Sequence, residues 1–104
     1  MTLQELDTAL KAVCPNTYEL AAPAGATRAI VWHCYGASHL IGGDCTVVDV
    51  PKVQIDILYQ QLDDSLADDV KEALRELHLP YEVQDDSYDD EYALRRCILL
   101  LEVY

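Results

Sequence analysis

Residues 52–104 constrain the fold of this chain more than any other segment. They read KVQIDILYQQLDDSLADDVKEALRELHLPYEVQDDSYDDEYALRRCILLLEVY. The pattern predicts a strand, an amphipathic helix that begins at clustered acids, a short strand, an acidic turn and a long apolar final strand. This order predicts a compact α+β unit whose last strand closes the sheet.

The helix expected in this segment has recognisable boundaries. Residues 63–65 (DDS) supply N-cap candidates, and Asp68 and Asp69 place further negative charge at the positive end of the helix dipole. Pro80 follows Leu79 and ends the helix. Its apolar stripe consists of Leu66, Val70, Ala73, Leu74 and Leu77.

The final strand is expected over residues 92–103, after a short strand at 81–84 and a turn at 85–91. Ile98 and Leu100 make its second face apolar as well, which indicates a central position or a strand covered by a partner. The residues expected to face the core are Ala93, Cys97, Leu99, Leu101 and Val103.

The first half predicts another helix and further strands. Thr2 and Glu5 match a capping box at the start of a helix over residues 3–13. Strands are expected at residues 17–20, 28–35 and 45–60, with loops at 21–27 and 37–44, and Pro51 marks an edge, a bulge or a break. The sequence therefore predicts one α+β domain over residues 1–104, with two helices packed on a mainly antiparallel sheet in the order α-(β)-β-β-α-β-β.

The charge of the chain excludes one large class of function. Its 104 residues carry a formal net charge of −12, and the seven basic residues are dispersed. Nucleic-acid binders cluster Lys and Arg to displace counterions from phosphates, so we expect no direct nucleic-acid binding. No membrane span or targeting segment is recognisable, and we expect the chain to be cytosolic when it is made.

The acidic turn at residues 85–91 suggests a calcium loop, because acids alternate along it. An EF-hand loop needs Gly at its sixth position and Glu at its twelfth, whereas these positions hold Asp90 and Arg96. The flanking segments are also strands rather than helices. We therefore expect no metal here, and a solvated turn or a contact with a cationic partner fits better.

Other reactive side chains are sparse. His33, His39 and Cys45 lack the short spacing of zinc ligands, and a nucleophilic Cys–His pair finds no better support. Gly42 and Gly43 are not followed by the Lys and helix of a phosphate-binding loop. Three of the four cysteines, Cys14, Cys34, Cys45 and Cys97, lie in apolar runs, where we expect a reduced thiol to behave as a small buried hydrophobe. The sequence thus predicts no catalytic site, no cofactor and no enzyme.

Five segments taken together resemble the small tail-completion proteins of long-tailed bacteriophages, also called tail terminators or head–tail joining proteins. The first is the N-terminal helix that ends near Pro-x-x-Tyr at residues 15–18. The other four are the strand at 29–35, VQIDILYQQLDD at 53–64, ELHLPYEV at 76–83 and YDDEYALRRCILLLEV at 88–103. The resemblance spans nearly the whole chain.

This resemblance implies a structural virion protein that forms a six-fold ring at the head end of the tail tube. The implied partners are the tail tube protein, a head-completion or connector protein, and further copies of the chain. The chain is expected to form a ring when assembled and to be a monomer or weak oligomer when free. Assembly would take place in the host cytoplasm and leave the protein in the virion tail. The expected protein-contact or channel-lining residues are Ser38, His39, Gly42, Asp44, Asp85, Asp86, Asp89, Asp90 and Glu91.

Two other kinds of function remain open. An acidic regulatory protein, such as a DNA-mimicking inhibitor, would space carboxylates along one face like duplex phosphates. The acids here gather at one helix start and one turn, which disfavours a mimic. A small enzyme that uses Cys34 or Cys45 is the other alternative.

Overall fold

The computed structural model describes residues 1–41, 47–91 and 93–103. Over these residues it confirms the predicted α+β class and the predicted order of elements. The elements are α1 (Leu3–Val13), β1 (Thr17–Glu19), β2 (Ala29–Ile41), β3 (Val47–Tyr59), α2 (Leu66–Glu76), β4 (Tyr81–Asp89) and β5 (Leu94–Glu102).

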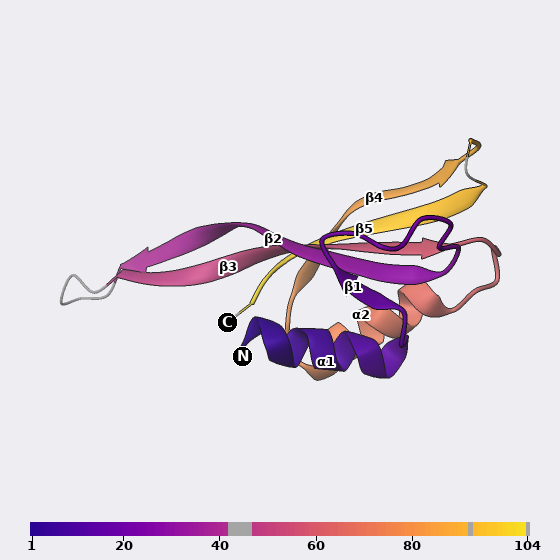
Figure 1. Cartoon of the computed structure of the whole chain (residues 1–104). Coiled ribbons are helices and arrows are strands. Elements are labelled where there is room, and N and C mark those ends of the chain that lie inside the picture. Colours follow the sequence, from indigo (N-terminus) through magenta and orange to yellow (C-terminus); the bar gives the residue numbers. More distant parts are fainter. Residues whose placement is uncertain (42–46, 92, 104) are drawn as a thin grey trace.

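The strands form one sheet in the order β1-β2-β3-β5-β4, and both helices lie against the same face of it (Figure 1). Strand β1 runs parallel to β2, and the other neighbours are antiparallel. The final strand β5 therefore has a neighbour on each side, as its two apolar faces predict. The expectation that this strand closes the sheet is wrong, because β4 lies at the edge.

Local hydrogen bonds begin the helices where the sequence predicts, but α2 ends at Glu76, before the expected stop at Leu79 and Pro80. In α1, the Thr2 Oγ1 accepts a hydrogen bond from the Glu5 amide at 3.1 Å. In α2, the Asp64 Oδ1 accepts a hydrogen bond from the Leu66 amide at 3.0 Å. Just after α2, His78 adopts a left-handed φ of 57°. The chain then turns, and the Leu79 amide donates to the Leu74 carbonyl at 2.9 Å.

The core lies between the helices and the sheet, and alternate strand residues supply it. Its rim is closed by the half-buried Asp7, whose Oδ1 accepts a hydrogen bond from Trp32 Nε1 at 2.8 Å. Removing the larger aliphatic side chains from water stabilises the fold by about 1.5–3 kcal/mol each. These fully buried side chains are Leu6, Leu10, Ile30, Ile55, Ile57, Leu66, Leu74 and Leu99.

Beyond this core, β2 and β3 continue as a two-stranded ribbon that projects away from the helices (Figure 1). Pairing with β1 ends at Trp32 and pairing with β5 ends at Lys52, whereas β2 and β3 stay paired out to Ile41 and Val47. We call residues 35–41 of β2 and 47–51 of β3 the arm. It accounts for the elongated shape of the molecule, 52 × 25 × 22 Å.

Several expected boundaries are wrong. Residues 37–41, expected to be part of a loop over 37–44, belong to β2, because they pair with β3. Residues 85–89, expected to be a turn, belong to β4, where pairing with β5 satisfies their backbone groups. Ala93, expected to face the core, is exposed with a left-handed φ of 52° and ends the β4–β5 turn.

Pro51 marks no break in the long β3 strand. It stands opposite Ala37 within the continuous β2–β3 pairing. Its carbonyl oxygen accepts a hydrogen bond from the Val103 amide at 3.0 Å, so its backbone faces away from β2. Proline is tolerated here because the ladder with β2 needs no donor at this position.

Candidate interaction surfaces

The face of the sheet opposite the helices, which we call the open face, is one candidate surface. Residues that alternate with the core positions of β3 and β5 point to this face. Most of them are half-buried, whereas Arg96 is exposed, and Gln54 Nε2 donates a hydrogen bond to Asp56 Oδ1 at 2.9 Å. The open face mixes aliphatic and charged groups from the two strands, namely Lys52, Gln54, Asp56, Leu58, Arg96, Ile98, Leu100 and Glu102.

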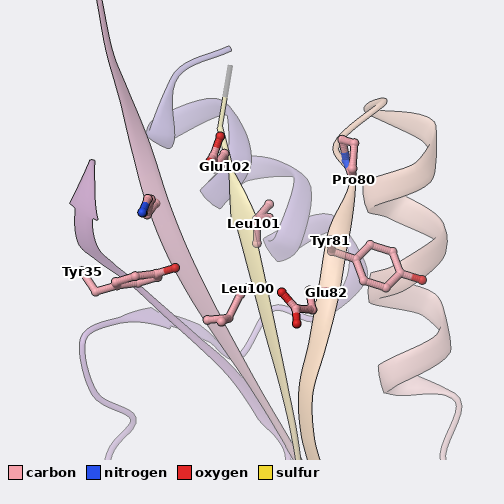
Figure 2. A pocket seen from close by; sticks show the side chains of 8 residues that line it. Tyr35, Pro80, Tyr81, Glu82, Leu100, Leu101 and Glu102 are labelled. Carbon is pink, nitrogen blue, oxygen red and sulfur yellow. The ribbon is translucent and has the colours of Figure 1, made fainter. Parts of the chain in front are cut away.

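A groove of about 330 Å³ lies at the root of the arm, where β5 ends beside β3 (Figure 2). Figure 2 shows Leu100 and Glu82 projecting to the side of the sheet on which Tyr35 lies, whereas the Tyr81 ring points toward α2. Tyr35 is the extra residue of a β-bulge, since the register shifts between Cys34 and Gly36. The bulge leaves its ring 49% exposed.

Strand β4 forms the second candidate surface, which we call the acidic edge: Glu82, Asp85, Asp86 and Asp89. It lies at the end of the sheet and is exposed along most of its length. Register with β5 places Asp85 opposite Ile98 on the open face and Asp86 opposite Cys97 on the helix face. The carboxylates therefore divide between two faces rather than forming one row.

Local contacts hold the end of this edge in place. Ser87 Oγ donates a hydrogen bond to Asp85 Oδ2 at 3.0 Å, and the Glu91 amide donates to Asp89 Oδ1 at 2.9 Å. The Arg95 guanidinium lies 5.8 Å from the centre of the Tyr88 ring, within cation–π range. The chain thus satisfies part of this edge itself, and carboxylates remain exposed for a cationic partner.

Burial and local hydrogen bonds shift the pKa of several groups. Burial raises the pKa of the Cys97 thiol, and it also raises the pKa of the Tyr59 phenol, to which Asp86 adds. Burial opposes ionisation of Asp7, but hydrogen bonds from Lys11 and Trp32 hold the pKa of its carboxyl below the ordinary value. Structural contacts explain these shifts without a catalytic role.

The geometry gives little support to thiol or metal chemistry. His33 and Cys34 are adjacent strand residues, so their side chains point to opposite faces. The Cys34 Sγ lies 3.3 Å from the Gly36 carbonyl oxygen, and the His33 ring packs edge-on to Tyr35 at 6.4 Å. Among residues 1–41, 47–91 and 93–103, no group of three or more His, Cys, Asp or Glu side chains is placed to hold a metal ion.

The cysteines only partly follow the expectation that they are buried. Cys14 and Cys97 are buried, whereas Cys34 is exposed because it precedes the bulge at the root of the arm. Cys45, a member of the weighed zinc set, lies outside the described residues. None of the described helices is long and apolar enough to cross a membrane.

The predicted contact residues do not form one site. Ser38 and His39 belong to β2 in the arm, and Gly42 and Asp44 lie outside the described residues. The acidic residues lie at the opposite edge of the sheet, where β4 holds Asp85, Asp86 and Asp89 and the following turn holds Asp90 and Glu91. The groove beside Tyr35 and Leu100 was not predicted, since it depends on where β5 ends relative to β3.

Comparison with known proteins adds a structural likeness. The sequence matches no protein-family model and no curated protein. Its structure is similar to that of a chain in the virion of a native gene transfer agent particle, with a TM-score of 0.63 and 14% sequence identity. The match covers 94% of this chain and 84% of that chain. At this identity the likeness shows a shared fold, and the resemblance to tail-completion proteins stays a prediction.

Proposed function

We propose that this chain is a structural virion protein that caps the tail tube and joins tail to head through a ring-forming protein–protein interface. The observation that carries the proposal is the shared fold with a chain of a gene transfer agent virion, over 94% of this chain. The segment order that resembles tail-completion proteins supports the same role independently of that likeness.

The surfaces of the molecule suit assembly better than catalysis. Its groove at the root of the arm is open and has aromatic, aliphatic and charged walls, without a nucleophile beside a base. The arm, by contrast, presents outward backbone groups on both of its strands, and the acidic edge exposes most of its residues. Contact with other proteins is therefore the function that this geometry serves.

In the proposed ring, the acidic edge lines the channel or contacts a neighbouring subunit. A ring through which a genome passes benefits from a negative lumen, because DNA phosphates are repelled rather than bound. We assign this role to some of the five acids at this end of the sheet. Docking of the chain as a six-fold ring tests the assignment, and placement of all five on the outer rim would contradict it. These acids are Asp85, Asp86, Asp89, Asp90 and Glu91.

Deletion of the gene tests the proposed function directly. In the genome that encodes the chain, we expect deletion to give tails of uncontrolled length and heads without tails, seen by negative-stain electron microscopy. A plasmid copy of the gene should restore uniform, joined tails. Particles of normal tail length and normal head attachment after deletion would refute the proposed function.

A DNA mimic is less consistent with the geometry. The carboxylates of β4 divide between two faces of the sheet, whereas a mimic of one DNA strand needs a single row. Competition experiments with duplex DNA and a DNA-binding protein test this alternative. Release of the protein from DNA by this chain would favour it.

A further inference from the structure

The arm has less structural support than the rest of the sheet. Beyond Trp32 in β2 and Pro51 in β3, whose carbonyl still accepts a hydrogen bond from the Val103 amide, the described residues of the two strands pair only with each other. A two-stranded hairpin is at best marginally stable by itself in water, and a third strand or a packed layer is needed for independent stability. The arm therefore gains stability from any additional strand.

Two hydrogen bonds beside β1 fix which backbone groups of β2 face outward. The Ile30 amide donates to the Asn16 carbonyl, and the Trp32 carbonyl accepts from the Leu20 amide, so both residues face β1. The bulge at Tyr35 shifts this alternation by one residue. Beyond the bulge, the outward-facing backbone groups belong to Ala37, His39 and Ile41.

The other edge of the arm is open in the same way. Because the Pro51 carbonyl faces Val103, alternation along β3 directs the backbone groups of Asp49 and Val47 away from β2. The two open edges lie on opposite sides of the arm. The β2 edge of one copy can therefore pair with the β3 edge of another, and the same contact can repeat from copy to copy.

The chain protects the β4 edge and leaves the β2 edge of the arm less protected, whereas the β3 edge of the arm carries Asp49 and Pro51. The acidic edge carries four carboxylates and a β-bulge at residue 84, devices that prevent strand addition. Residues 37–41 (ASHLI) contain no Lys, Arg, Asp, Glu or Pro. This contrast is expected if β4 avoids pairing with a strand of another molecule and the β2 edge of the arm accepts such a strand.

Charge also favours contact between arms. Residues 20–55 contain Asp44, Asp49, Arg28 and Lys52, which cancel to a formal charge of zero. Residues 56–104 contain fourteen acidic and four basic residues, a formal charge of −10. Two copies repel each other through their acidic ends, and the neutral segment that includes the arm can approach at the least electrostatic cost.

We propose that the arm pairs edge to edge with the arm of a second copy, so that the outward groups of β2 in one copy bond those of β3 in the next. The inference rests on the proposed function, in which copies form a ring, and it identifies the contact that closes this ring. Such a contact is heterologous, and repeated around an axis it closes when the rotation allows. The groove lined by Tyr35 and Leu100 lies beside this contact and has room for a flanking side chain.

A pair of Ala→Lys variants tests the proposal in the full-length chain. Lysine on an edge strand opposes strand addition. Ala37 lies on the open β2 edge, and Ala12 is an exposed α1 residue that serves as the matched control with the same change of charge. By sedimentation velocity over a concentration series, we expect wild type and Ala12→Lys to associate and Ala37→Lys to associate at least about tenfold more weakly. Circular dichroism confirms that both variants are folded.

Residue-resolved amide exchange gives a second readout that does not depend on a variant. On raising the wild-type concentration, the outward amides of His39 and Asp49 should exchange more slowly, whereas the inward amides of Ser38 and Val50 are already protected. Protection of the β2 edge alone would contradict the head-to-tail contact. Equal association of both lysine variants, or wild type that stays monomeric at its highest soluble concentration, would overturn the proposal.

Complementation separates this inference from the proposed function. If deletion disturbs the tails and Ala37→Lys restores them as well as wild type does, the arm contact is wrong and the virion role stands. If arms pair in solution and deletion leaves tails unchanged, the contact stands and the virion role is wrong.

Discussion

Asp64 connects the N-terminus of α2 to the strand side of the domain, and its removal should destabilise the fold measurably. One carboxylate oxygen caps the Leu66 amide at 3.0 Å. The same carboxylate accepts two hydrogen bonds from Arg28, 2.9 Å from Nε and 3.2 Å from Nη2. Asp64→Ala removes both interactions at once, whereas Asp64→Asn retains an oxygen acceptor and loses the charge.

The expected cost follows from these two contacts. Asp64 lies just before the N-cap residue Ser65, and loss of the hydrogen bond that it accepts from the first helical amide costs about 0.5–1.5 kcal/mol, the net value of a typical hydrogen bond. The ion pair adds about 0.2–1 kcal/mol, because the Arg28 side chain is 47% exposed and solvent screens the attraction. We therefore expect the free energy of unfolding to fall by about 1–2 kcal/mol for Asp64→Ala and by about half of that for Asp64→Asn.

Urea unfolding followed by circular dichroism measures these differences, and Asp63→Ala, at an exposed neighbouring carboxylate, is the matched control. In thermal unfolding each kcal/mol corresponds to about 4–8 °C in Tm for a domain near this size. A double-mutant cycle with Arg28→Ala isolates the ion pair. If Asp64→Ala costs no more than Asp63→Ala, the reasoning from the cap and the ion pair is refuted.

The same contacts predict a dependence on pH. The hydrogen bonds from Arg28 lower the pKa of the Asp64 carboxyl below its ordinary value, with a further contribution from the Leu66 amide, while burial opposes them. A lowered folded pKa adds stability that is complete above the unfolded value of about 3.9 and is lost as pH falls through the folded pKa. The stability difference between wild type and Asp64→Asn should therefore be largest near neutral pH and shrink in acid below about pH 4.

Three further outcomes are expected from the core. Asp7→Ala leaves the Trp32 indole N–H without its carboxylate acceptor and should cost about 1–3 kcal/mol, measured by urea unfolding with Trp32 fluorescence; an unchanged midpoint would contradict this role. Leu99→Ala removes a fully buried side chain and should cost about 2–5 kcal/mol, whereas Leu20→Ala, at a 74% exposed side chain, should change stability by less than about 0.5 kcal/mol. A maleimide should label the exposed Cys34 in the folded chain and the buried Cys97, whose thiol pKa burial raises, only after unfolding, as read by peptide mass spectrometry. Equal labelling rates of the two thiols in the folded chain would refute the conclusion that Cys34 is exposed and Cys97 is buried.

Local signals in the sequence were sufficient to predict where both helices begin. The cap at Thr2 and the acids before Leu66 mark the starts of α1 and α2, because these interactions lie within a few positions along the chain. Both partners of such an interaction lie close together in the sequence, so the interaction can be predicted without knowledge of the tertiary structure. The end of α2 was less well predicted, since the helix stops at Glu76, before Pro80.

Strand ends were less predictable, because a strand continues as long as a partner remains beside it. Ser38 and His39 were expected in a loop and belong to β2, since β3 supplies pairing partners out to Val47. Asp85 and Asp86 were expected in a turn and belong to β4, since β5 supplies the matching backbone groups. Composition suggested turns at both places, and long-range pairing outweighed it.

Residues 52–104 show the same division. The sequence by itself determined that this half forms a strand, a helix and two more strands, and that its acids suit neither a calcium loop nor a catalytic site. Only the tertiary structure decided that β5 lies inside the sheet, that β4 carries the acids at its edge, and that β2 and β3 extend beyond their neighbours as an arm. The physical reason is that strand order and open edges depend on hydrogen bonds between segments far apart in sequence, which no local pattern specifies.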